Sequence, residues 1–295
     1  MADVDPVKHS DVVIAGANYT GLSAALCLAE MAGGDIRITI VDRAHHDAQA
    51  PDPRCFALSA GARNVLVRLG VWAKVAPSAQ DVTAIALSDS PLDAAVRPIL
   101  LRYDNWLEDG TPAASIVPGP VLLDALRDAV DRSANIAVDE NFEIAEVATA
   151  AGGITVSNPD GAAYSASLLI GADGRHSKVR KLANIKTTTF AHGQTGIVAV
   201  IKHTDPHDGC AIQHFLPAGP FAILPLPGGR SCITWSEKDA SAQQILALDD
   251  AGFLDEIDRR VAGQLGHLEL DGPRGSFPLS SQLARTYVGE RIALV

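Results

Sequence analysis

The sequence is poor in cysteine and lacks long hydrophobic runs. Its 295 residues contain four cysteines, which lie far apart and form no Cys-x-x-Cys pair. A disulfide or zinc framework is therefore not expected, and a reducing cytoplasm fits this composition. No stretch reaches the roughly 20 apolar residues that a membrane-spanning helix requires. The N-terminal segment MADVDPVKHSD is polar and acidic, which is not the pattern of a secretory signal.

Basic residues are also scarce. The chain has 24 Lys and Arg against 35 Asp and Glu, which gives a net charge of −11. Nucleic acid is therefore not expected as a partner, because phosphate binding needs a basic surface. Hydrophobic residues, in contrast, make up 47% of the chain. A chain of this length and composition can bury a sizeable core in one large domain or in two intertwined ones.

The first 42 residues predict one β-α-β unit. Residues 11–15 (DVVIA) form a short apolar run typical of a buried strand. The turn sequence GANYTG follows, and residues 22–31 are rich in Ala and Leu, as in a helix that ends at the Gly33-Gly34 pair. Residues 36–41 predict a second strand, which Asp42 closes. About 30 residues is the usual size of such a parallel crossover.

The pattern changes farther along the chain. From about residue 194 to 236, short apolar runs broken by Pro and Gly predict a mainly antiparallel sheet. The final run RIALV, residues 291–295, is expected to return as a strand to the first part of the fold. Other elements are expected as helices at residues 60–70, 121–132 and 253–265 and as a strand at residues 167–170.

The loop between the first strand and helix has the spacing of a dinucleotide-binding fingerprint. Gly16 supplies the tight turn and Gly21 the close helix–strand packing, while the helix N-terminus faces a pyrophosphate. Asp42 lies about 20 residues farther on, where a carboxylate accepts hydrogen bonds from the hydroxyls of an adenosine ribose. Asn18 replaces the central glycine; it tolerates left-handed backbone angles better than most residues, but its side chain must point away from the ligand. A glycine-bearing turn of some other α/β protein is the alternative interpretation.

Three stretches carry a more specific signal together than any one does alone. They are GANYTGL with VDR, DPR (residues 52–54) with ALSAG and LGVW, and GADGRHSKVR (residues 171–180). The later runs GPFAILPLPGGRSCITW and FPLSSQLARTYVGERIALV add to the pattern. In combination they resemble the class A flavin monooxygenases, and most closely the polyprenylphenol hydroxylases of ubiquinone biosynthesis, over nearly the whole chain.

This resemblance implies an α/β fold. A Rossmann-like FAD-binding domain with a parallel sheet would be interrupted by a β-rich antiparallel substrate domain, as in para-hydroxybenzoate hydroxylase. The implied boundaries place the FAD-binding domain at residues 1–78, 112–185 and 286–295, and the substrate domain at residues 79–111 and 186–285.

The resemblance also implies where FAD would be held. Arg54 would lie along the flavin, and Asp173 with Gly174 would form a second fingerprint at the end of a strand. Taken alone, Arg54 could equally be a surface cation, and Asp173-Gly174 could be a strand-ending turn. The implied cofactor-binding residues are Gly16, Ala17, Gly21, Asp42, Arg43, Arg54, Asp173 and Gly174.

The sequence departs from the family pattern at three places. The first is Asn18. The second is Gly119-Pro120, where many family members carry a polar or basic residue that contacts FAD. The third is the end of the chain, because the family continues after IALV with a Gly-Asp motif and a loop beside the isoalloxazine ring. We therefore expect a sequence that is truncated before its last flavin-binding segment.

The implied activity is hydroxylation of an aromatic ring, with FAD as cofactor and NAD(P)H and O₂ as co-substrates. The expected substrate is a small aromatic molecule, such as a phenol with a polyprenyl tail. No residue is forced into the role of catalytic acid or base. An isoprenoid-lipid flavin reductase or epoxidase and a non-catalytic flavoprotein of a biosynthetic complex remain open alternatives. The expected location is cytoplasmic, with peripheral contact at the inner membrane open because of the lipid substrate.

No metal site is predicted. His203, His207 and His214 invite the idea, but Pro206 and Gly209 prevent a helix from presenting two of them together. The pair His45-His46 follows Asp42 and is expected to be a solvated loop pair. Cys27 is interpreted as a core residue, and Ser177 as the cap of the following helix rather than a nucleophile.

Overall fold

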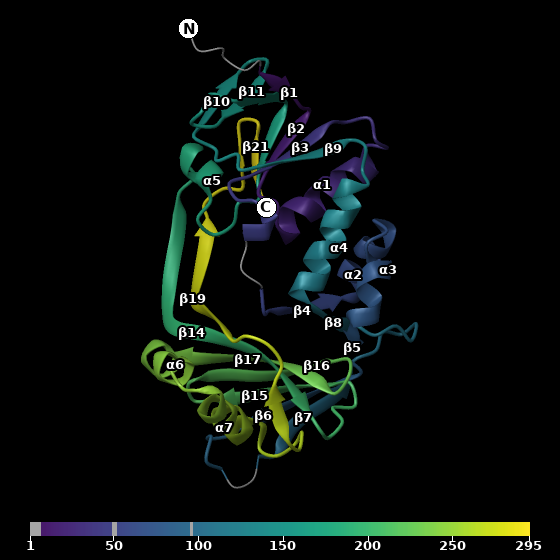
Figure 1. Ribbon diagram of the computed structural model, residues 1–295, viewed down its shortest axis with the longest axis vertical. Coiled ribbons are helices and arrows are strands. Elements are labelled where there is room, and N and C mark those ends of the chain that lie inside the picture. The colour runs from purple at the N-terminus through teal and green to yellow at the C-terminus, as the bar shows by residue number, and fades with distance from the viewer. Residues whose placement is uncertain (1–6, 49–51, 95–96) are drawn as a thin grey trace.

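The computed structural model describes residues 7–48, 52–94 and 97–295 (Figure 1). The first six residues of the polar N-terminal segment lie outside this part. None of the helices in the described ranges combines the length and the apolar character needed to cross a membrane.

A mainly parallel sheet forms the upper part of the molecule in Figure 1. Its strand order is β20-β21-β13-β2-β3-β9, and all neighbours except β20 and β21 run parallel. All four residues of β2 are buried, because both faces of the sheet are covered. The strands are β2 (Val12–Ala15), β3 (Ile38–Asp42), β9 (Ile136–Glu140), β13 (Leu168–Gly171), β20 (Val288–Gly289) and β21 (Ile292–Leu294).

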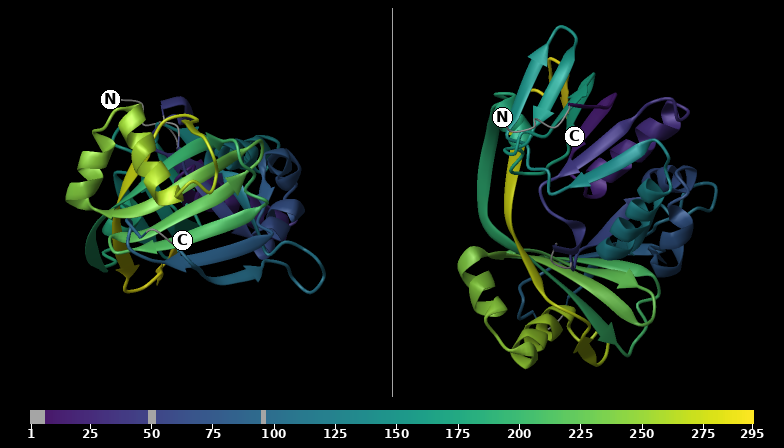
Figure 2. Two further views of the ribbon diagram at one scale, coloured as in Figure 1. Left: turned by 90° about the horizontal axis from the view of Figure 1, so that it is seen from below. Right: turned by 45° about the horizontal axis from the view of Figure 1, so that its top comes forward.

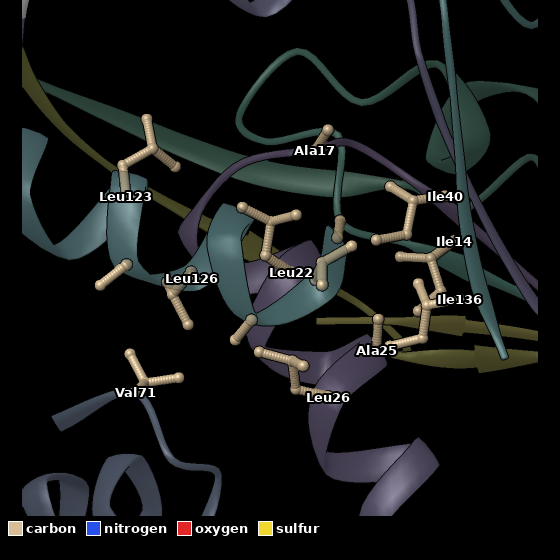
Figure 3. Packing of buried hydrophobic residues seen from close by; sticks show 14 of the residues in the cluster. Ile14, Ala17, Leu22, Ala25, Leu26, Ile40, Val71, Leu123, Leu126 and Ile136 are labelled. Atoms are coloured by element: carbon tan, nitrogen blue, oxygen red, sulfur yellow. The ribbon is translucent and has the colours of Figure 1, made fainter. Parts of the chain in front are cut away.

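Helices α1 (Tyr19–Met31) and α4 (Gly119–Asp131) cover one face of this sheet. Alternate strand residues such as Ile14 and Ile40 pack against Leu22 and Leu126 of the helices (Figure 3). The opposite face carries a small sheet and the short helix α5 (Lys178–Leu182). The small sheet has the order β1-β12-β11-β10, with β1 (Lys8–His9), β10 (Glu146–Ala150), β11 (Gly153–Ser157) and β12 (Ala163–Ala166).

A three-stranded antiparallel sheet lies between the upper and lower parts of the molecule (Figure 1). Its order is β4-β8-β5, and α2 and α3 pack close to it and to α4. The elements are β4 (Cys55–Ser59), β5 (Gln80–Asp81), β8 (Ala114–Pro118), α2 (Ala60–Arg68), α3 (Trp72–Val75) and the short 3-10 helices His46–Ala48 and Ala76–Ser78.

A large sheet forms the lower part. It is antiparallel apart from the parallel pair β6 and β15. Helices α6 (Asp239–Leu246) and α7 (Asp250–Val261) cover its outer face, where they bury Trp235 and Phe253 (Figure 2). The strands are β6 (Ala84–Asp89), β7 (Ile99–Asp104), β14 (Thr187–His203), β15 (Cys210–Leu216), β16 (Gly219–Leu226), β17 (Arg230–Lys238), β18 (Leu268–Leu270) and β19 (Gly275–Ala284).

Two long strands join the lower sheet to the upper part. β14 has 17 residues and pairs antiparallel with β19 from Thr187↔Ala284 to Val198↔Gly275. The register shifts between Ala191 and Gln194, and Gly193 there has φ +64°. The chain thus leaves the upper part on one continuous strand and returns on its neighbour (Figure 1).

The predicted fold class is confirmed. The β-α-β unit, the antiparallel region and the helices near residues 60, 121 and 253 are present, with ends shifted by a few residues. The final strand β21 pairs with β13, as expected for a return to the first sheet. The four-stranded side sheet and α6 were not predicted. The division into the residue ranges given above stays a prediction.

Candidate cofactor-binding site

Two loops meet at the carboxyl ends of the parallel strands. The Gly16 N–H donates to Val41 O at 2.8 Å, and the Ala172 N–H donates to Ala15 O at 2.8 Å. Gly16 has φ +108°, and a Cβ atom there would lie 2.4 Å from Ala172 O and 3.1 Å from the Cα of Asp173. Only glycine fits this position, so the first fingerprint and the GADG segment are packed directly against each other.

Gly21 fixes the approach of helix α1 to the same turn. A Cβ atom at Gly21 would lie 1.8 Å from the carbonyl oxygen of Gly16 and 3.4 Å from the Cβ of Ala172. The two predicted glycines therefore act as the sequence pattern requires: one makes the turn and the other allows the helix to begin against it.

Asn18 has a different role from the one expected. Its backbone is extended, with φ −116°, so the site makes no use of asparagine's tolerance for left-handed angles. Its side chain is the N-cap of α1, where Oδ1 accepts a hydrogen bond from the Tyr19 N–H at 2.7 Å. The residue is exposed, at the start of the helix.

Asp42 ties the fingerprint to the end of β3. Its Oδ2 accepts from the Ala17 N–H at 2.7 Å, and its Oδ1 accepts from the Ala44 N–H at 3.0 Å. The carboxylate is half-buried and lies beside the turn, as the spacing indicated. Arg43, the next residue, is exposed.

Asp173 is the most informative residue of the second fingerprint. Its Oδ2 accepts from the Lys178 N–H at 2.6 Å and from the Val179 N–H at 3.1 Å, so it holds the start of α5. Its other oxygen, Oδ1, is buried and has no hydrogen-bond partner. Gly174 follows with φ +76° and open space around it. Ser177 accepts from the Arg180 N–H at 2.9 Å, which confirms its predicted role as a cap.

Arg54 belongs to a cluster that the sequence only partly predicted. Its Nε and Nη2 donate to Asp52 at 2.8 and 2.6 Å, and the Tyr19 hydroxyl donates to the same carboxylate at 3.1 Å. The guanidinium also lies 5.5 Å from the ring centre of Phe56 and 5.0 Å from that of Phe277. Arg54 is therefore an organised group rather than a loose surface cation.

The charges of this cluster support one another. Burial acts to raise the pKa of Asp52, but the hydrogen bonds from Arg54 outweigh it and hold that pKa below its usual value. Burial, together with the nearby Asp52 carboxylate, raises the pKa of the Tyr19 hydroxyl well above its usual value. At neutral pH the cluster thus contains an ionised Asp52, a charged Arg54 and a neutral Tyr19.

Tyr19 also accounts for the unusual Gly119-Pro120 sequence. A Cβ atom at Gly119 would lie 2.8 Å from the Tyr19 hydroxyl oxygen and 2.8 Å from Arg54 O. The tyrosine therefore leaves no room for a side chain at the first residue of α4. Sequence reasoning missed Tyr19, although its position inside the fingerprint and the DPR motif were both visible.

A cavity of about 650 Å³ begins at the fingerprint and extends toward the end of β9. Ala17 and Arg127 are among the residues that line it, and Nη2 of Arg127 is buried without a hydrogen-bond partner. A free donor of this kind suits an anionic or polar ligand group. Arg127 lies on a helix face that looked only amphipathic in sequence.

His203, His207 and His214 form hydrogen bonds within the large lower sheet and its loops. His203 bonds Ser231 Oγ at 3.0 Å, and His207 bonds Leu226 O at 2.8 Å. His214 is buried, 2.6 Å from the hydroxyl of Ser88. Each ring has a local hydrogen-bond partner, which explains its presence without a metal ion.

Comparison with known proteins gives consistent results. Residues 9–295 match a family described as an FAD binding domain. Ubiquinone hydroxylase UbiL of Rhodospirillum rubrum is 33% identical over 291 residues, which cover 98% of this chain and 66% of that protein. The mitochondrial ubiquinone biosynthesis monooxygenase COQ6 of Danio rerio is 27% identical, and the match covers 90% of this chain and 57% of that protein.

The fold is shared with solved flavoprotein structures. The flavin-dependent monooxygenase PieE, solved in complex with FAD and substrate, superposes with a TM-score of 0.77 at 17% identity, covering 98% of this chain and 53% of that one. The chain thus spans between about half and two thirds of the length of these three proteins.

The residues present fit FAD. The unpartnered Oδ1 of Asp173 and the Gly16 turn lie side by side at the strand ends, and the helix N-terminus of α1 begins there. The contacts of the individual residues with the cofactor stay predictions. From its match over residues 9–295, the chain belongs to the family described as an FAD binding domain.

Proposed function

We propose that the protein is an FAD-dependent monooxygenase that hydroxylates an aromatic ring, with a polyprenylated phenol of ubiquinone biosynthesis as its substrate. One observation carries the proposal: Gly16, Asp42 and Asp173 converge at the carboxyl edge of the parallel sheet, next to a cavity that the fingerprint opens into. The names of the relatives UbiL and COQ6 support the choice of substrate class.

The proposed roles of the residues follow from their positions. Gly16 and Gly21 let the pyrophosphate approach the start of α1, with Ala17 beside them. Asp42, flanked by Arg43, would exchange its contact with the Ala17 N–H for the ribose hydroxyls. Asp173 and Gly174 would receive the chain that leads to the flavin ring. Bound FAD would supply the redox chemistry with NAD(P)H and O₂.

Arg54 is the proposed positive charge beside the flavin. Asp52 fixes the guanidinium through two nitrogens, and Phe277 from β19 covers its face. This arrangement holds a cation in one orientation at the place where the upper and lower parts of the fold meet. No residue is assigned as catalytic acid or base.

The substrate wall is proposed on the inner face of the large sheet. In the segment FAILPLP, Phe221 and Ile223 face the helices on the outer side, whereas Leu224 and Leu226 face the three-stranded sheet. Leu224, which is only partly buried, is therefore the residue available to an apolar substrate and to the exclusion of water, whereas Leu226 is 1% exposed and belongs to the core between the two sheets.

Peripheral contact with a membrane is part of the proposal because a polyprenylated substrate would reside there. The edge strand β7 supports it, since Ile99, Leu100, Leu101 and Tyr103 are all exposed. Flotation of the chain with vesicles of neutral phospholipid tests this point. Loss of flotation in Leu100→Asp would support a contact through β7, and equal flotation of both proteins would remove β7 from it.

FAD titration of the 295-residue chain tests the cofactor site first. Quenching of flavin fluorescence should show binding that Asp42→Ala weakens at least tenfold. Asp35→Ala, an exposed aspartate after α1, serves as the control. Equal affinity of Asp42→Ala and the parent chain would contradict the assigned ribose contact, provided that thermal melts show both variants folded.

Product analysis then separates the possible reactions. With NAD(P)H, a polyprenylphenol and ¹⁸O₂, the proposed hydroxylase incorporates one labelled oxygen atom into the ring. Reduction or epoxidation of the isoprenoid tail would identify the reductase or epoxidase instead. FAD binding with no turnover, by a protein that spans the full length of the relatives UbiL and COQ6, would favour the non-catalytic flavoprotein.

A further inference from the structure

Two adjacent histidines and a glutamate meet at the ends of neighbouring strands. His45 and His46 follow β3, and Glu140 is the last residue of β9, paired in register with Asp42. Their nitrogen and oxygen ligand atoms all lie within 4.8 Å of one another. Within residues 7–48, 52–94 and 97–295, no other three His, Cys, Asp or Glu side chains come together in this way.

The distances in this cluster suit a metal ion. His45 Nε2 lies 3.1 Å from Glu140 Oε2, and His46 Nδ1 lies 2.9 Å from Glu140 Oε1. Ligands held tetrahedrally at about 2.0–2.2 Å from a zinc ion are about 3.3–3.6 Å apart. Glu140 Oε2 also lies 3.0 Å from His46 Nδ1, so one carboxylate oxygen faces both imidazoles. An outward shift of each imidazole from Glu140 by a few tenths of an ångström would give the His–Glu spacing of a zinc site, while the two ring nitrogens need only stay within the 4.8 Å that now bounds the group.

Asp47 completes the arrangement from the other side. Its Oδ2 lies 3.5 Å from His45 Nδ1, and its Oδ1 lies 3.2 Å from His46 Nε2. Each imidazole thus presents one ring nitrogen to Glu140 and the other to Asp47, although His45 Nδ1 also accepts from the Asp47 backbone N–H at 3.3 Å. Metal-binding histidines characteristically turn their second N–H to a carboxylate, which fixes the ring and increases its basicity, and His46 has this arrangement.

The backbone holds the cluster in place and leaves it accessible. The His46 N–H donates to Glu140 Oε1 at 3.1 Å, which ties the histidine loop to β9. The two rings are stacked with their centres 4.4 Å apart. His45, His46 and Glu140 line the cavity of about 650 Å³, and the histidine side chains are 45% and 43% exposed, so an ion can enter.

We propose that His45, His46 and Glu140 form a binding site for a divalent transition-metal ion of the Zn²⁺ class. Two imidazoles with one carboxylate favour Zn²⁺, Ni²⁺ or Cu²⁺ over Mg²⁺ and Ca²⁺, which prefer sets of oxygen ligands. Three protein ligands leave the fourth position to water. The site lines the same cavity as the proposed FAD site, but it rests on the geometry of these side chains, so Zn²⁺ binding tests it without any monooxygenase activity.

Zn²⁺ titration of the untagged, chelator-treated chain tests the proposal by calorimetry. We expect one ion per chain, with affinity reduced at least tenfold in His46→Ala and in Glu140→Gln. The glutamine can still accept the His46 N–H, so its fold is retained. The matched control is His267→Ala, which removes an exposed histidine 3.9 Å from Glu269 and should leave Zn²⁺ binding unchanged.

Asp47→Asn examines the supporting carboxylate and should weaken binding about tenfold. As a second readout, Co²⁺ should give the visible absorption of a four-coordinate site with the parent chain and lose it with Glu140→Gln. Absence of stoichiometric Zn²⁺ binding, or equal affinities of the parent chain, His46→Ala and Glu140→Gln, would overturn the proposal and leave a solvated histidine–carboxylate cluster.

Discussion

Replacing Gly16 with alanine tests whether the two fingerprints are packed as tightly as the geometry indicates. The residue has φ +108°, beyond the left-handed helical region that alanine can enter. The new Cβ would also lie 2.4 Å from the carbonyl oxygen of Ala172. The alanine variant is therefore destabilised both by backbone strain at residue 16 and by a steric clash with Ala172.

The expected magnitude follows from these two terms. Holding a non-glycine residue at such an angle costs about 1–3 kcal/mol. Moving Ala172 away by about 1 Å, to restore an ordinary contact, adds about 1–3 kcal/mol as in other overpacked sites. Gly16→Ala should therefore lower the free energy of unfolding by about 2–6 kcal/mol. The displaced GADG segment should also weaken FAD binding at least tenfold.

Urea denaturation measures the first effect and flavin fluorescence the second. Gly33→Ala is the matched control, because Gly33 also has positive φ, +63°, but has nothing within 4 Å of its would-be Cβ. It should lose only about 1–2 kcal/mol and bind FAD normally. A Gly16→Ala chain no less stable than Gly33→Ala would refute the inferred contact with Ala172.

Two further variants test buried charges. Asp52→Asn should lower stability at pH 7 by about 1 kcal/mol, a value reduced because Arg54 is 43% exposed. The pKa of Asp52 is lowered in the folded chain. Its contribution to stability is therefore present above the unfolded pKa of about 4 and is lost as pH falls through the folded pKa. The stability difference between the parent chain and Asp52→Asn should be smaller at pH 3 than at pH 7, and an equal difference at both would contradict the assignment. Arg260→Ala leaves Glu237 buried without its partner at 3.3 Å and should cost about 3–5 kcal/mol. Arg259→Ala, whose side chain is 57% exposed, should cost less than about 1 kcal/mol in the same denaturation series, and similar losses for both would remove the buried pair as the reason.

The parts of the fold that sequence predicts well are those with a strong local signal, either a continuous apolar run or a helical period. The run DVVIA and the helix at residues 119–131 carry such patterns, and both occur where expected. The side sheet of β10, β11 and β12 was missed because its strands have only four or five residues each, and β10 has no buried residue at all. Short strands of this kind are defined by their partners rather than by local sequence.

In the candidate site too, some residues can be predicted from local sequence and others only from contacts with distant segments. Gly16, Gly21 and Asp42 belong to one β-α-β unit, β2-α1-β3, so their spacing within that unit places them. Tyr19 and Arg127 owe their significance to contacts with distant segments, namely Asp52 in one case and the wall of a cavity in the other. The histidine pair was seen in sequence, but Glu140 lies 94 residues from His46, and only the register of β3 with β9 brings them together.

The paired strands β14 and β19 determine how the lower sheet can move relative to the upper one. A ladder of backbone hydrogen bonds resists bending far more than a flexible linker does. The register shift between Ala191 and Gln194, with Gly193 inside it, interrupts that ladder. Any movement of the lower sheet relative to the upper part should therefore bend these two strands at the register shift, and its amplitude should depend on the backbone freedom of Gly193.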